Sequence, residues 1–514
     1  MMPAKDTPPD LRLDRLLEGL VEGGPGVPSL VVRGLSLDSR DICPGDVFFA
    51  LAGTRCHGLR YAEAAIAAGA CAILYEPAEG GTELARGISA VPCVPVAGLQ
   101  QRVGQIADRF YGEPSRHLDI IGITGTNGKT SCSHFLAHAL NNHRPAAVIG
   151  TLGWGVLGEL SSTSHTTPDA IEVHALLDRL RGQNVRAVAM EASSHGLVQG
   201  RVNGVRFRGG LFTNLSRDHL DYHGNMEAYL DAKLRLVRWP ELNFIAFNLD
   251  DPSAEGVLRA APAGLRRLAY TLNAARGRTV DAELVCASAV AQRGDGVSFR
   301  VSHSFLEAEV SAPLYGRFNV ENLLGVTAVL LGMGYSLGEA ARRVSRVKAV
   351  PGRMERFSAR SGYEVIVDYA HTPDALEKVL DNLRQHCKGR LTAVFGCGGD
   401  RDKGKRPQMG AIAERLADRV IVTDDNPRTE DGQRIVEEIL AGCQAPSQLR
   451  VQRDRRAAIA EALADARPGD MVLVAGKGHE DTQDIGGIKH PFSDRVVVCE
   501  LLQAMGQGVS DATD

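Results

Sequence analysis

One stretch of the sequence combines the residue types that hold a triphosphate. Residues 124–131 read Thr-Gly-Thr-Asn-Gly-Lys-Thr-Ser and stand between the apolar run 118–123 and the helical pattern 134–140. Glycines let backbone N–H groups turn towards phosphate oxygens, and the N-terminus of the following helix adds partial positive charge. In such a loop Lys129 would reach the β- and γ-phosphates and the Thr130 hydroxyl would hold Mg²⁺. The pattern therefore predicts a nucleoside triphosphate site.

The loop departs from the strict phosphate-loop motif at one position. That motif, G-x-x-x-x-G-K-[ST], requires a glycine where this chain has Ile123, and the glycines are instead Gly122, Gly125 and Gly128. A glycine-rich turn with a chance Lys-Thr pair is the alternative interpretation. The order of strand, loop and helix favours the phosphate site.

Composition excludes several classes of protein. The 514 residues include 58 Lys and Arg against 62 Asp and Glu, which gives a formal net charge of −4. Neither the basic excess of a general nucleic-acid-binding protein nor the composition of a disordered chain is present. Ten cysteines are scattered without a C-x-x-C pair, and no run of about 18 apolar residues occurs. We therefore expect a reduced, cytoplasmic protein without a membrane span or a cleaved export signal.

Length and sequence texture predict an α/β protein of three domains, since roughly 150 residues make one domain. Residues 1–98 contain short strand-like pieces around an Ala-rich helix, which predicts a small N-terminal α/β domain. Residues 99–350 carry apolar runs that suit a central parallel sheet covered on both faces. Residues 351–514 alternate strands with helices, which predicts a doubly wound, Rossmann-like sheet.

The expected elements follow from the same patterns. We expect strands at 30–37, 46–51, 72–75, 118–123, 187–190, 210–215, 244–249, 365–367, 391–395, 420–422 and 471–474, and helices at 61–68, 100–110, 134–140, 226–236, 375–383, 409–416, 435–439 and 457–463. Ligands of such sheets bind beyond the carboxyl ends of the strands, so the residues that follow each strand are the candidates for function.

Residues 124–130 resemble the signature of the Mur ligases, which with the folylpolyglutamate synthetases form a superfamily of ATP-dependent amide-forming enzymes. Further blocks resemble the same family in the same order, at 190–197, 213–223, 316–322, 352–355, 368–373, 398–407, 425–428 and 475–480. These blocks span nearly the whole chain. Within the family they are most similar to the ligases that add the third residue of the peptidoglycan stem peptide.

The resemblance implies a reaction in two steps that uses ATP and Mg²⁺. ATP phosphorylates the γ-carboxylate of UDP-N-acetylmuramoyl-L-alanyl-D-glutamate, and the amine of meso-2,6-diaminopimelate then attacks the acyl phosphate and expels phosphate. Phosphorylation supplies the leaving group that a free carboxylate lacks, so the enzyme must neutralise charge and align two anionic reactants. Small-molecule substrates, no nucleic acid and a monomer are expected.

The resemblance implies that Lys129, Glu191, His219 and Lys233 carry catalysis. Glu191 and His219 would bind Mg²⁺ together with Thr130. Lys233 would be carbamylated, which converts a cation into an anionic oxygen donor for the metal. From the residues alone, Glu191 could be a solvated strand cap, His219 a structural histidine and Lys233 a surface lysine.

The implied ATP-binding set extends beyond the phosphate loop. It comprises Gly125, Thr126, Asn127, Gly128, Lys129, Thr130, Ser131, Asn319, Asn322, Arg353 and Asp368. Arg353 stands at the expected hinge between the second and third domains, where it could close over ATP and exclude water from the acyl phosphate. A salt bridge at the hinge is the alternative.

Two further sets are implied for the other substrates. The UDP-N-acetylmuramoyl-dipeptide would contact Leu37, Ser39, Thr54, Arg55, Cys56, His165, Thr166, Thr167, Ser193, Gln199 and Arg201, and diaminopimelate would contact Arg401, Asp425, Asn426, Pro427, Arg428, Gly476 and Glu480. Arg428 is the discriminating residue, because a guanidinium can hold the second carboxylate that diaminopimelate has and lysine lacks. Glu480 could pair with the far ammonium. Generic turns and a surface charge are the alternatives.

Three other functions remain open at this point. A lysine-adding sister ligase would lack the Asp-Asn-Pro-Arg pattern of residues 425–428. A folylpolyglutamate synthetase would leave the N-terminal region without a function. A phosphate-loop switch or an inactive binding module would bind ATP without substrate-dependent phosphate release, and the joint presence of Lys129, Glu191, His219 and Lys233 argues against it.

Overall fold

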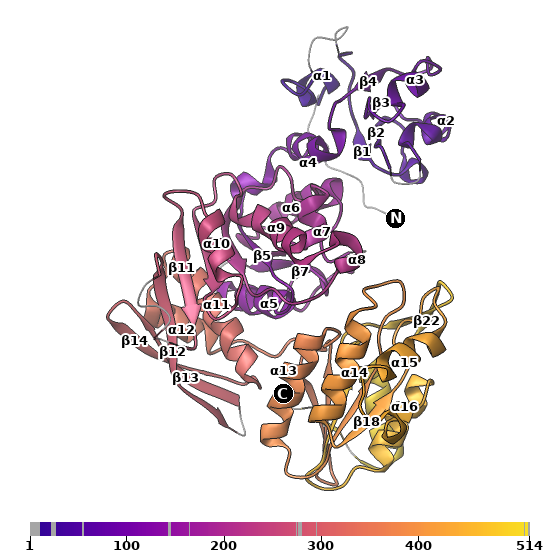
Figure 1. The fold of residues 1–514 in the computed structure, drawn as a ribbon. Helices are drawn as coiled ribbons and strands as arrows, with labels where there is room; N and C mark the ends of the chain where they lie inside the picture. The colour runs from indigo at the N-terminus through magenta and orange to yellow at the C-terminus, as the bar shows by residue number, and fades with distance from the viewer. Residues whose placement is uncertain are drawn as a thin grey trace. The chain divides into compact units, whose positions relative to one another are not determined.

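The computed structural model describes residues 11–21, 27–53, 56–141, 145–163, 165–273, 275, 280–293, 296–507 and 509–511 (Figure 1). The chain divides into two compact units, Met1–Gly122 with Asn142–Arg208 and Trp239–Leu242, and Ile123–Asn141 with Gly209–Arg238 and Asn243–Asp514. The domain boundaries after residues 98 and 350 stay predictions.

A four-stranded parallel sheet in the order β1-β2-β3-β4 forms the N-terminal part. Every residue of β2 and β3 is buried, as expected for strands covered on both faces. The elements are α1 (Leu13–Leu16), β1 (Gly34–Ser36), η1 (Ser39–Asp41), β2 (Asp46–Ala50), η2 (Gly58–Tyr61), α2 (Ala62–Ala67), β3 (Ala72–Tyr75), α3 (Gly81–Ala85), β4 (Cys93–Pro95), α4 (Leu99–Phe110) and η3 (Pro114–His117).

A ten-stranded sheet in the order β14-β13-β12-β11-β10-β9-β5-β8-β6-β7 forms the central part. Its strands are β5 (Asp119–Thr124), β6 (Ala146–Gly150), β7 (Gly153–Val156), β8 (Ala187–Glu191), β9 (Phe207–Phe212), β10 (Phe244–Asn248), β11 (Arg266–Thr271), β12 (Glu283–Arg293), β13 (Gly296–His303) and β14 (Leu306–Ala312). The run from β9 to β12 pairs in parallel, whereas β12, β13 and β14 form an antiparallel meander.

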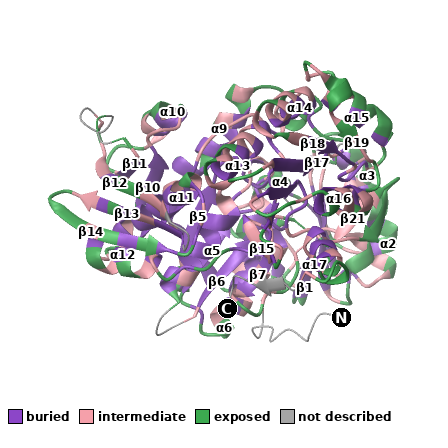
Figure 2. Cartoon of the chain, turned by 90° about the horizontal axis from the view of Figure 1, so that it is seen from below, coloured by how far each residue is buried: buried purple, intermediate pink, exposed green. Residues whose placement is uncertain are grey.

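The helices of the central part are α5 (Lys129–Leu140), α6 (Ala170–Gly182), α7 (Ser194–Val198), α8 (Leu220–His223), α9 (Met226–Val237), α10 (Ala254–Ala260), α11 (Arg317–Gly332) and α12 (Leu337–Val344). Twelve residues of α11 are buried, because this helix is apolar on all sides. Strands β5 and β10 are buried in the same way (Figure 2). The expected parallel sheet is therefore confirmed.

A seven-stranded sheet in the order β19-β18-β17-β20-β16-β15-β23 forms the C-terminal part. Its elements are β15 (Glu355–Ala359), β16 (Glu364–Asp368), α13 (Pro373–His386), β17 (Leu391–Phe395), α14 (Lys405–Leu416), β18 (Arg419–Val422), α15 (Gly432–Leu440), η5 (Pro446–Gln448), β19 (Arg450–Val451), α16 (Arg455–Ala464), β20 (Met471–Ala475), β21 (Thr482–Ile485), β22 (Ile488–Pro491), α17 (Asp494–Ala504) and β23 (Val509–Asp511). Strands β21 and β22 form a separate hairpin.

Successive residues of the C-terminal strands enter two different hydrophobic clusters. Ala393 packs in the cluster that α13, α14 and α15 cover, and its neighbour Val394 packs in the cluster that α16 and α17 cover. Leu473 and Val474 alternate in the same way. Helices therefore cover both faces of a mainly parallel sheet, and the doubly wound prediction is confirmed.

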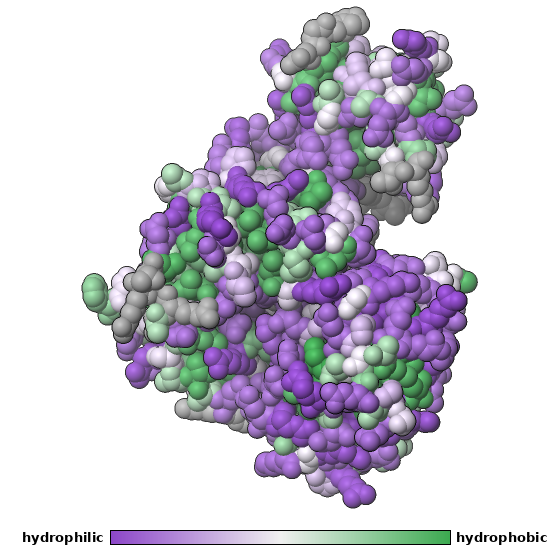
Figure 3. Space-filling model, in the orientation of Figure 1, coloured by the Kyte–Doolittle hydropathy of each residue, from purple (hydrophilic) through white to green (hydrophobic). Residues whose placement is uncertain are grey.

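Polar residues dominate the face of the molecule drawn in Figure 3, and hydrophobic residues are visible there only in small patches. Among the described residues, no helix is both long and apolar enough to cross a membrane.

Candidate active site

The glycine-rich loop joins β5 to α5 in the way that the sequence predicts. Gly128 has φ +84° and precedes the first residue of α5, Lys129. Gly125 has φ +147°, and a Cβ atom at this position would lie 1.9 Å from the Thr213 hydroxyl oxygen. Only glycine fits both this backbone angle and this close approach.

Polar groups that follow β9 hold the loop. The Asn127 N–H donates to Asn214 Oδ1 at 2.9 Å, and the Thr213 hydroxyl donates to the Asn127 carbonyl at 2.6 Å. We predicted that β9 extends to residue 215, but the strand ends at Phe212. The side chains of the next two residues bond to the loop, which accounts for the earlier end of the strand.

Asn322 supports the other side of the loop from α11. A Cβ atom at Gly128 would lie 2.6 Å from Asn322 Oδ1, so the amide packs directly against the loop backbone. Asn322 Nδ2 donates to Asn319 Oδ1 at 3.2 Å, and Asn319 Nδ2 donates to the Tyr315 carbonyl at 2.7 Å. Both predicted asparagines therefore belong to one hydrogen-bonded chain beside the loop.

Two lysines meet at the Gly125 carbonyl. Lys129 Nζ donates to it at 2.8 Å and Lys233 Nζ at 2.7 Å. The Lys233 side chain from α9 is 1% exposed, and its Nζ lies 4.4 Å from the centre of the Tyr229 ring. Burial and the charge of Lys129 lower the pKa of Lys233 well below its ordinary value. Lys233 is therefore not a surface lysine, and its amine is poised to lose its proton.

The buried carboxylate of Asp218 lies at the centre of a charged cluster that includes the partly exposed His219. His219 has φ +55°, and its backbone N–H donates to Asp218 Oδ1 at 3.0 Å. Lys405 Nζ lies 3.4 Å from Asp218 Oδ1, and His371 Nε2 lies 3.7 Å from Asp218 Oδ2. Burial opposes ionisation, but Lys405, the hydrogen bond from His371 and the charge of His219 hold the pKa of Asp218 well below its usual range.

Arg353 contacts both the phosphate loop and the C-terminal part. Its Nη2 donates to the Thr130 hydroxyl at 3.3 Å, and its Nη1 lies 3.4 Å from His479 Nδ1. The guanidinium carbon stands 4.1 Å from the centre of the Tyr369 ring, at the distance of a cation–π contact. Asp368, in contrast, accepts the backbone N–H groups of Met354 and Ala370 and so braces the segment that carries Arg353.

Glu191 ends β8 as a buried carboxylate rather than a solvated cap. Its side chain is 1% exposed, and its two oxygens accept the Thr151 N–H at 2.9 Å and the Thr151 hydroxyl at 3.0 Å. The Thr151 hydroxyl also lies 3.1 Å from the Thr166 hydroxyl. These donors satisfy the buried carboxylate and fix its orientation.

The predicted dipeptide-binding residues of the central part form one network around Thr167. The Thr167 hydroxyl donates to the Glu191 carbonyl at 2.8 Å and lies 3.0 Å from Ser193 Oγ. Arg201 donates to the Thr167 carbonyl at 2.8 Å and to Gln199 Oε1 at 2.9 Å. Thr167, Ser193, Gln199 and Arg201 are thus linked directly, and Thr166 joins them through Thr151 and Glu191. The side chain of His165 is exposed.

The predicted uridine-binding residues of the N-terminal part follow β1 and β2. Ser39 begins η1, Leu37 packs on the core, and Cys56 Sγ lies 3.5 Å from the Tyr61 hydroxyl. Thr54 and Arg55 lie outside the described residues.

Three polar residues form a closed triangle in the predicted amine-binding site. Asn426 Nδ2 donates to Glu480 Oε2 at 2.8 Å, Lys477 Nζ donates to the same oxygen at 2.8 Å, and Lys477 also donates to Asn426 Oδ1 at 3.0 Å. A Cβ atom at Gly476 would lie 2.4 Å from Asp425 Oδ2, so Asp425 also belongs to this group. The strand-end segments that follow β18 and β20 are thereby joined.

The β21–β22 hairpin fixes the backbone of Arg428. The Arg428 N–H donates to the Asp484 carbonyl at 2.9 Å, and the Gly486 N–H donates to the Arg428 carbonyl at 2.7 Å. These bonds hold Arg428 at φ +53°, while its Nη1 donates to the Gly399 carbonyl at 2.5 Å. Arg428 is therefore held between the β21–β22 hairpin and the segment that follows β17. Arg401 is exposed, and Pro427 directly precedes Arg428.

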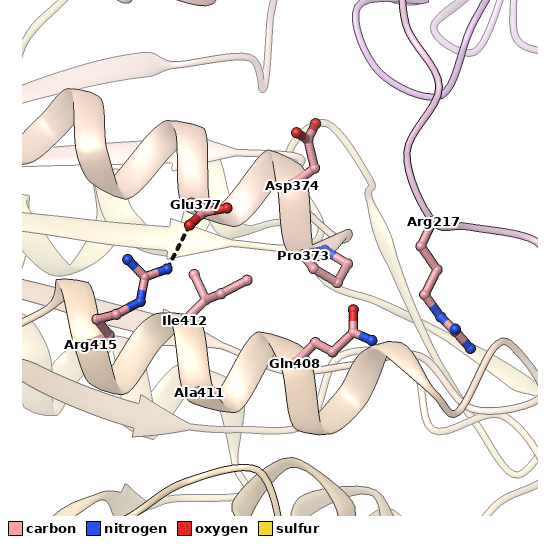
Figure 4. Close-up of a pocket in the computed structure, with 8 residues that line it drawn as sticks. All are labelled: Arg217, Pro373, Asp374, Glu377, Gln408, Ala411, Ile412 and Arg415. Carbon is pink, nitrogen blue, oxygen red and sulfur yellow. Dashed lines mark hydrogen bonds and ion pairs between the residues drawn. The ribbon is translucent and has the colours of Figure 1, made fainter. Parts of the chain in front are cut away.

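A pocket of about 490 Å³ opens between α13 and α14 (Figure 4). The residues that line it are Arg217, Pro373, Asp374, Glu377, Gln408, Ala411, Ile412 and Arg415. Arg415 and Glu377 form an ion pair at its wall. None of the predicted site residues lines this pocket. The candidate functional residues lie elsewhere, in the strand-end loops.

Sequence reasoning missed Asp218, Lys477 and Thr151 as members of the site. Asp218 and Lys477 stand inside the matched blocks, and their types offered the signal, since a charged residue next to a strand-end motif is a candidate. Thr151 carried no signal, because a single threonine after an apolar run is common. Among the described residues, no group of three or more His, Cys, Asp or Glu side chains could hold a metal ion by itself.

A glycine-rich loop between a parallel strand and a helix, followed by a doubly wound sheet with charged strand-end loops, fits an enzyme that uses a nucleoside triphosphate. The chain matches the "Mur ligase family, catalytic domain" over residues 31–111, the "Mur ligase middle domain" over 123–330 and the "Mur ligase, glutamate ligase domain" over 352–478. The chain therefore belongs to the Mur ligase family.

Similar proteins carry a more particular name. A protein of Xylella fastidiosa (strain Temecula1) is 47% identical over 500 residues, which cover 96% of this chain and 99% of that protein. One of Ectopseudomonas mendocina is 49% identical over 477 residues, with 92% and 96% covered. Both are named UDP-N-acetylmuramoyl-L-alanyl-D-glutamate–2,6-diaminopimelate ligase.

Solved structures agree with this result. A structure of a ligase with the same name has a TM-score of 0.68 and 37% identity, and covers 97% of this chain and 99% of that one. A folylpolyglutamate synthase of Mycobacterium tuberculosis has a TM-score of 0.60 at 19% identity over 73% of this chain and 92% of that one, which shows the shared fold alone.

Proposed function

We propose that this chain is an ATP-dependent ligase that joins 2,6-diaminopimelate to UDP-N-acetylmuramoyl-L-alanyl-D-glutamate in the synthesis of peptidoglycan precursors. The observation that carries the proposal is the near full-length identity of 47% to a ligase of that name. Two features of the C-terminal strand-end loops support it: the Arg428 guanidinium donates to the Gly399 carbonyl, and Asn426 donates to Glu480. The far end of diaminopimelate carries an ammonium and a carboxylate, so a site that binds it needs both a negative and a positive side chain.

In this proposal the phosphate loop binds ATP and the C-terminal loops bind the amine. Lys129 turns from the Gly125 carbonyl to the β- and γ-phosphates, and the N-terminus of α5 adds partial positive charge. Arg353 already contacts the Thr130 hydroxyl and can follow the γ-phosphate during transfer. The γ-carboxylate of the dipeptide attacks the γ-phosphorus, ADP leaves, and the amine then displaces phosphate from the acyl phosphate.

The network around Thr167 would hold the dipeptide end of the nucleotide substrate. Arg201 would bind a carboxylate through its guanidinium, and Ser193 would donate its hydroxyl. Leu37, Ser39 and Cys56 would contact the uridine end. These residues align the acyl donor, and alignment alone can lower the barrier by several kcal/mol, roughly 7–11 in favourable cases.

Mg²⁺ is part of the same proposal, and the residues present suit it. Thr130, Glu191, His219 and a carbamylated Lys233 would supply oxygen and nitrogen donors, and Mg²⁺ bound to ATP needs only one or two protein carboxylates beside the phosphates. Bound metal would neutralise phosphate charge. The lowered pKa of Lys233 fits the role, because only the neutral amine adds carbon dioxide to give the carbamate and a proton.

We also propose a cytoplasmic, monomeric enzyme that acts on small molecules, since ATP and UDP-linked precursors are cytoplasmic substrates. The test of the central proposal is phosphate release from ATP with UDP-N-acetylmuramoyl-L-alanyl-D-glutamate, measured with diaminopimelate, with lysine and with neither. Release that requires diaminopimelate supports it. Release with lysine alone would assign the chain to the sister ligase, and no release with either amine would refute both.

A further inference from the structure

Lys477 is buried at a place where a lysine has no ordinary structural reason to be. It is the second residue after β20, and its side chain is 0% exposed. A buried ammonium is costly unless it is paired and hydrogen-bonded. Its partners are Asn426 Oδ1 at 3.0 Å and Glu480 Oε2 at 2.8 Å, which both belong to the proposed amine-binding site.

The pairing leaves one oxygen of Glu480 for a ligand. Oε2 accepts from both Lys477 and Asn426, whereas Oε1 accepts no hydrogen bond from the residues that the structure describes. The Glu480 side chain is 29% exposed, so a ligand can reach it. Asn426 Oδ1 accepts from Lys477 and from the Asp484 N–H at 3.0 Å, which fixes the orientation of the amide. The direction of Oε1 is therefore set before any ligand binds.

The pairing with Lys477 also cancels the negative charge of Glu480. Without Lys477, Glu480 would give this part of the site an uncompensated negative charge. Such a charge attracts an isolated ammonium, as at the end of lysine, and repels the neighbouring carboxylate of diaminopimelate. With Lys477 present the pair is neutral. A neutral, oriented pair suits a zwitterionic group better than a cation.

We propose that Lys477 determines specificity for the amine substrate by neutralising and orienting Glu480, so that the site accepts the zwitterionic end of diaminopimelate in preference to the cationic end of lysine. Lys477 acts through Glu480 and is a positioning residue. This inference rests on the proposed function, because it assumes that Asn426, Arg428 and Glu480 bind the amine.

The decisive variant is Lys477→Met, which removes the charge at similar length. Lys489→Met on the exposed strand β22 is the matched control. Phosphate release gives kcat/KM with diaminopimelate and with lysine. Hydroxamate formation with hydroxylamine, in the absence of either amine, reports the acyl phosphate alone. We expect the KM for diaminopimelate to rise roughly 10- to 100-fold, as for the loss of charged hydrogen bonds. The ratio of kcat/KM for diaminopimelate to that for lysine should fall about tenfold.

Hydroxamate formation should stay near the wild-type rate in Lys477→Met, and Lys477→Arg, which keeps the charge, should keep the ratio. A role in folding alone would lower kcat for both amines equally and leave the ratio unchanged, and that result would overturn the proposal. The proposed function fails separately, if the wild-type protein forms no hydroxamate and releases no phosphate.

Glu480→Gln changes the charge of the Lys477–Glu480 pair by removing its negative member. It tests the proposal even if Lys477→Met does not fold. It leaves the charge of Lys477 without its partner, so the site becomes more positive. Lysine should then lose more kcat/KM than diaminopimelate, and the ratio should rise. An unchanged ratio, or a fall, would contradict the proposal.

Discussion

The fully buried ion pair of Arg455 and Asp494 connects the stability of the C-terminal part to its amine-binding loops. Both side chains are 0% exposed, and two bonds join them, Nε to Oδ1 at 2.8 Å and Nη2 to Oδ2 at 2.7 Å. Arg455 also donates to the Ala475 carbonyl at 2.9 Å and to the Asp424 carbonyl at 3.4 Å. These carbonyls immediately precede Gly476 and Asp425, which begin the two loops.

We predict that Arg455→Met destabilises the protein by about 3–5 kcal/mol, the cost of removing one partner of a buried ion pair. Neither side chain is exposed, so solvent does not reduce this value. The double variant Arg455→Met with Asp494→Leu leaves no buried charge. The Ala475 and Asp424 carbonyls then each lose the bond from Arg455, at about 1–3 kcal/mol for a buried group, while Gln483 Nε2 still donates to the Asp424 carbonyl. The double variant should therefore be more stable than the single one.

Denaturant unfolding gives the total free energy, and hydrogen exchange of peptides from β18 and β20 locates the change. Arg495→Met is the control, because the Arg495 ion pair with Glu355 is 38% and 16% exposed and should contribute only about 0–1 kcal/mol. If Arg455→Met unfolds at the same denaturant concentration as Arg495→Met, the pair does not hold the loops and the reasoning is refuted.

Three further predictions concern the phosphate side and acid stability. Lys233→Ala should lose nearly all turnover and regain part of it with short carboxylic acids; wild-type turnover would contradict the carbamate. Gly125→Ala should weaken ATP binding in calorimetry by at least roughly tenfold, because φ +147° and a Cβ 1.9 Å from Thr213 strain the loop. Burial and the charge of Arg353 lower the pKa of His134 to about 4 and of His479 to about 3. Unfolded histidines bind protons below about pH 6.5 and these folded ones do not, so the free energy of unfolding should fall as pH drops below 6.5, by about 1.4 kcal/mol per pH unit for each histidine. Proton uptake on unfolding at pH 5, lower by about one in His134→Asn, checks this sign.

Apolar runs predicted the buried strands well, and β17 begins and ends where the pattern places it. The antiparallel strand β13 was not predicted, since exposed and intermediate residues interrupt its apolar ones. Strand β22 was not predicted either, because all four of its residues are exposed and carry no burial signal. Burial helped prediction but was not sufficient, because the fully buried strand β6 was not predicted either.

The candidate site likewise contains residues that the sequence could predict and residues that it could not. Gly125 and Gly128 follow from local backbone chemistry, so the sequence pattern was sufficient. The burial of Lys233 depends on the distant Gly125 carbonyl, and that of Lys477 depends on the distant Asn426 amide and the nearby Glu480 carboxylate. By itself, a lysine in a sequence is expected at the surface. Only the family resemblance singled out Lys233, and Lys477 was missed although it stands inside a matched block.

The strand-end segments of this protein hold one another, and this explains why its functional residues come in pairs. Buried polar groups need partners. The phosphate loop finds them in Thr213 and Asn214, which follow β9, and the Asn426 segment finds them in Lys477 and Glu480, which follow β20. In the first pair the phosphate loop is assigned to ATP and the segment after β9 fixes its geometry. In the second pair Lys477 fixes Asn426 and Glu480, which are both assigned to the amine. A substitution in the supporting segment should therefore alter substrate binding as strongly as one in the segment that touches the substrate.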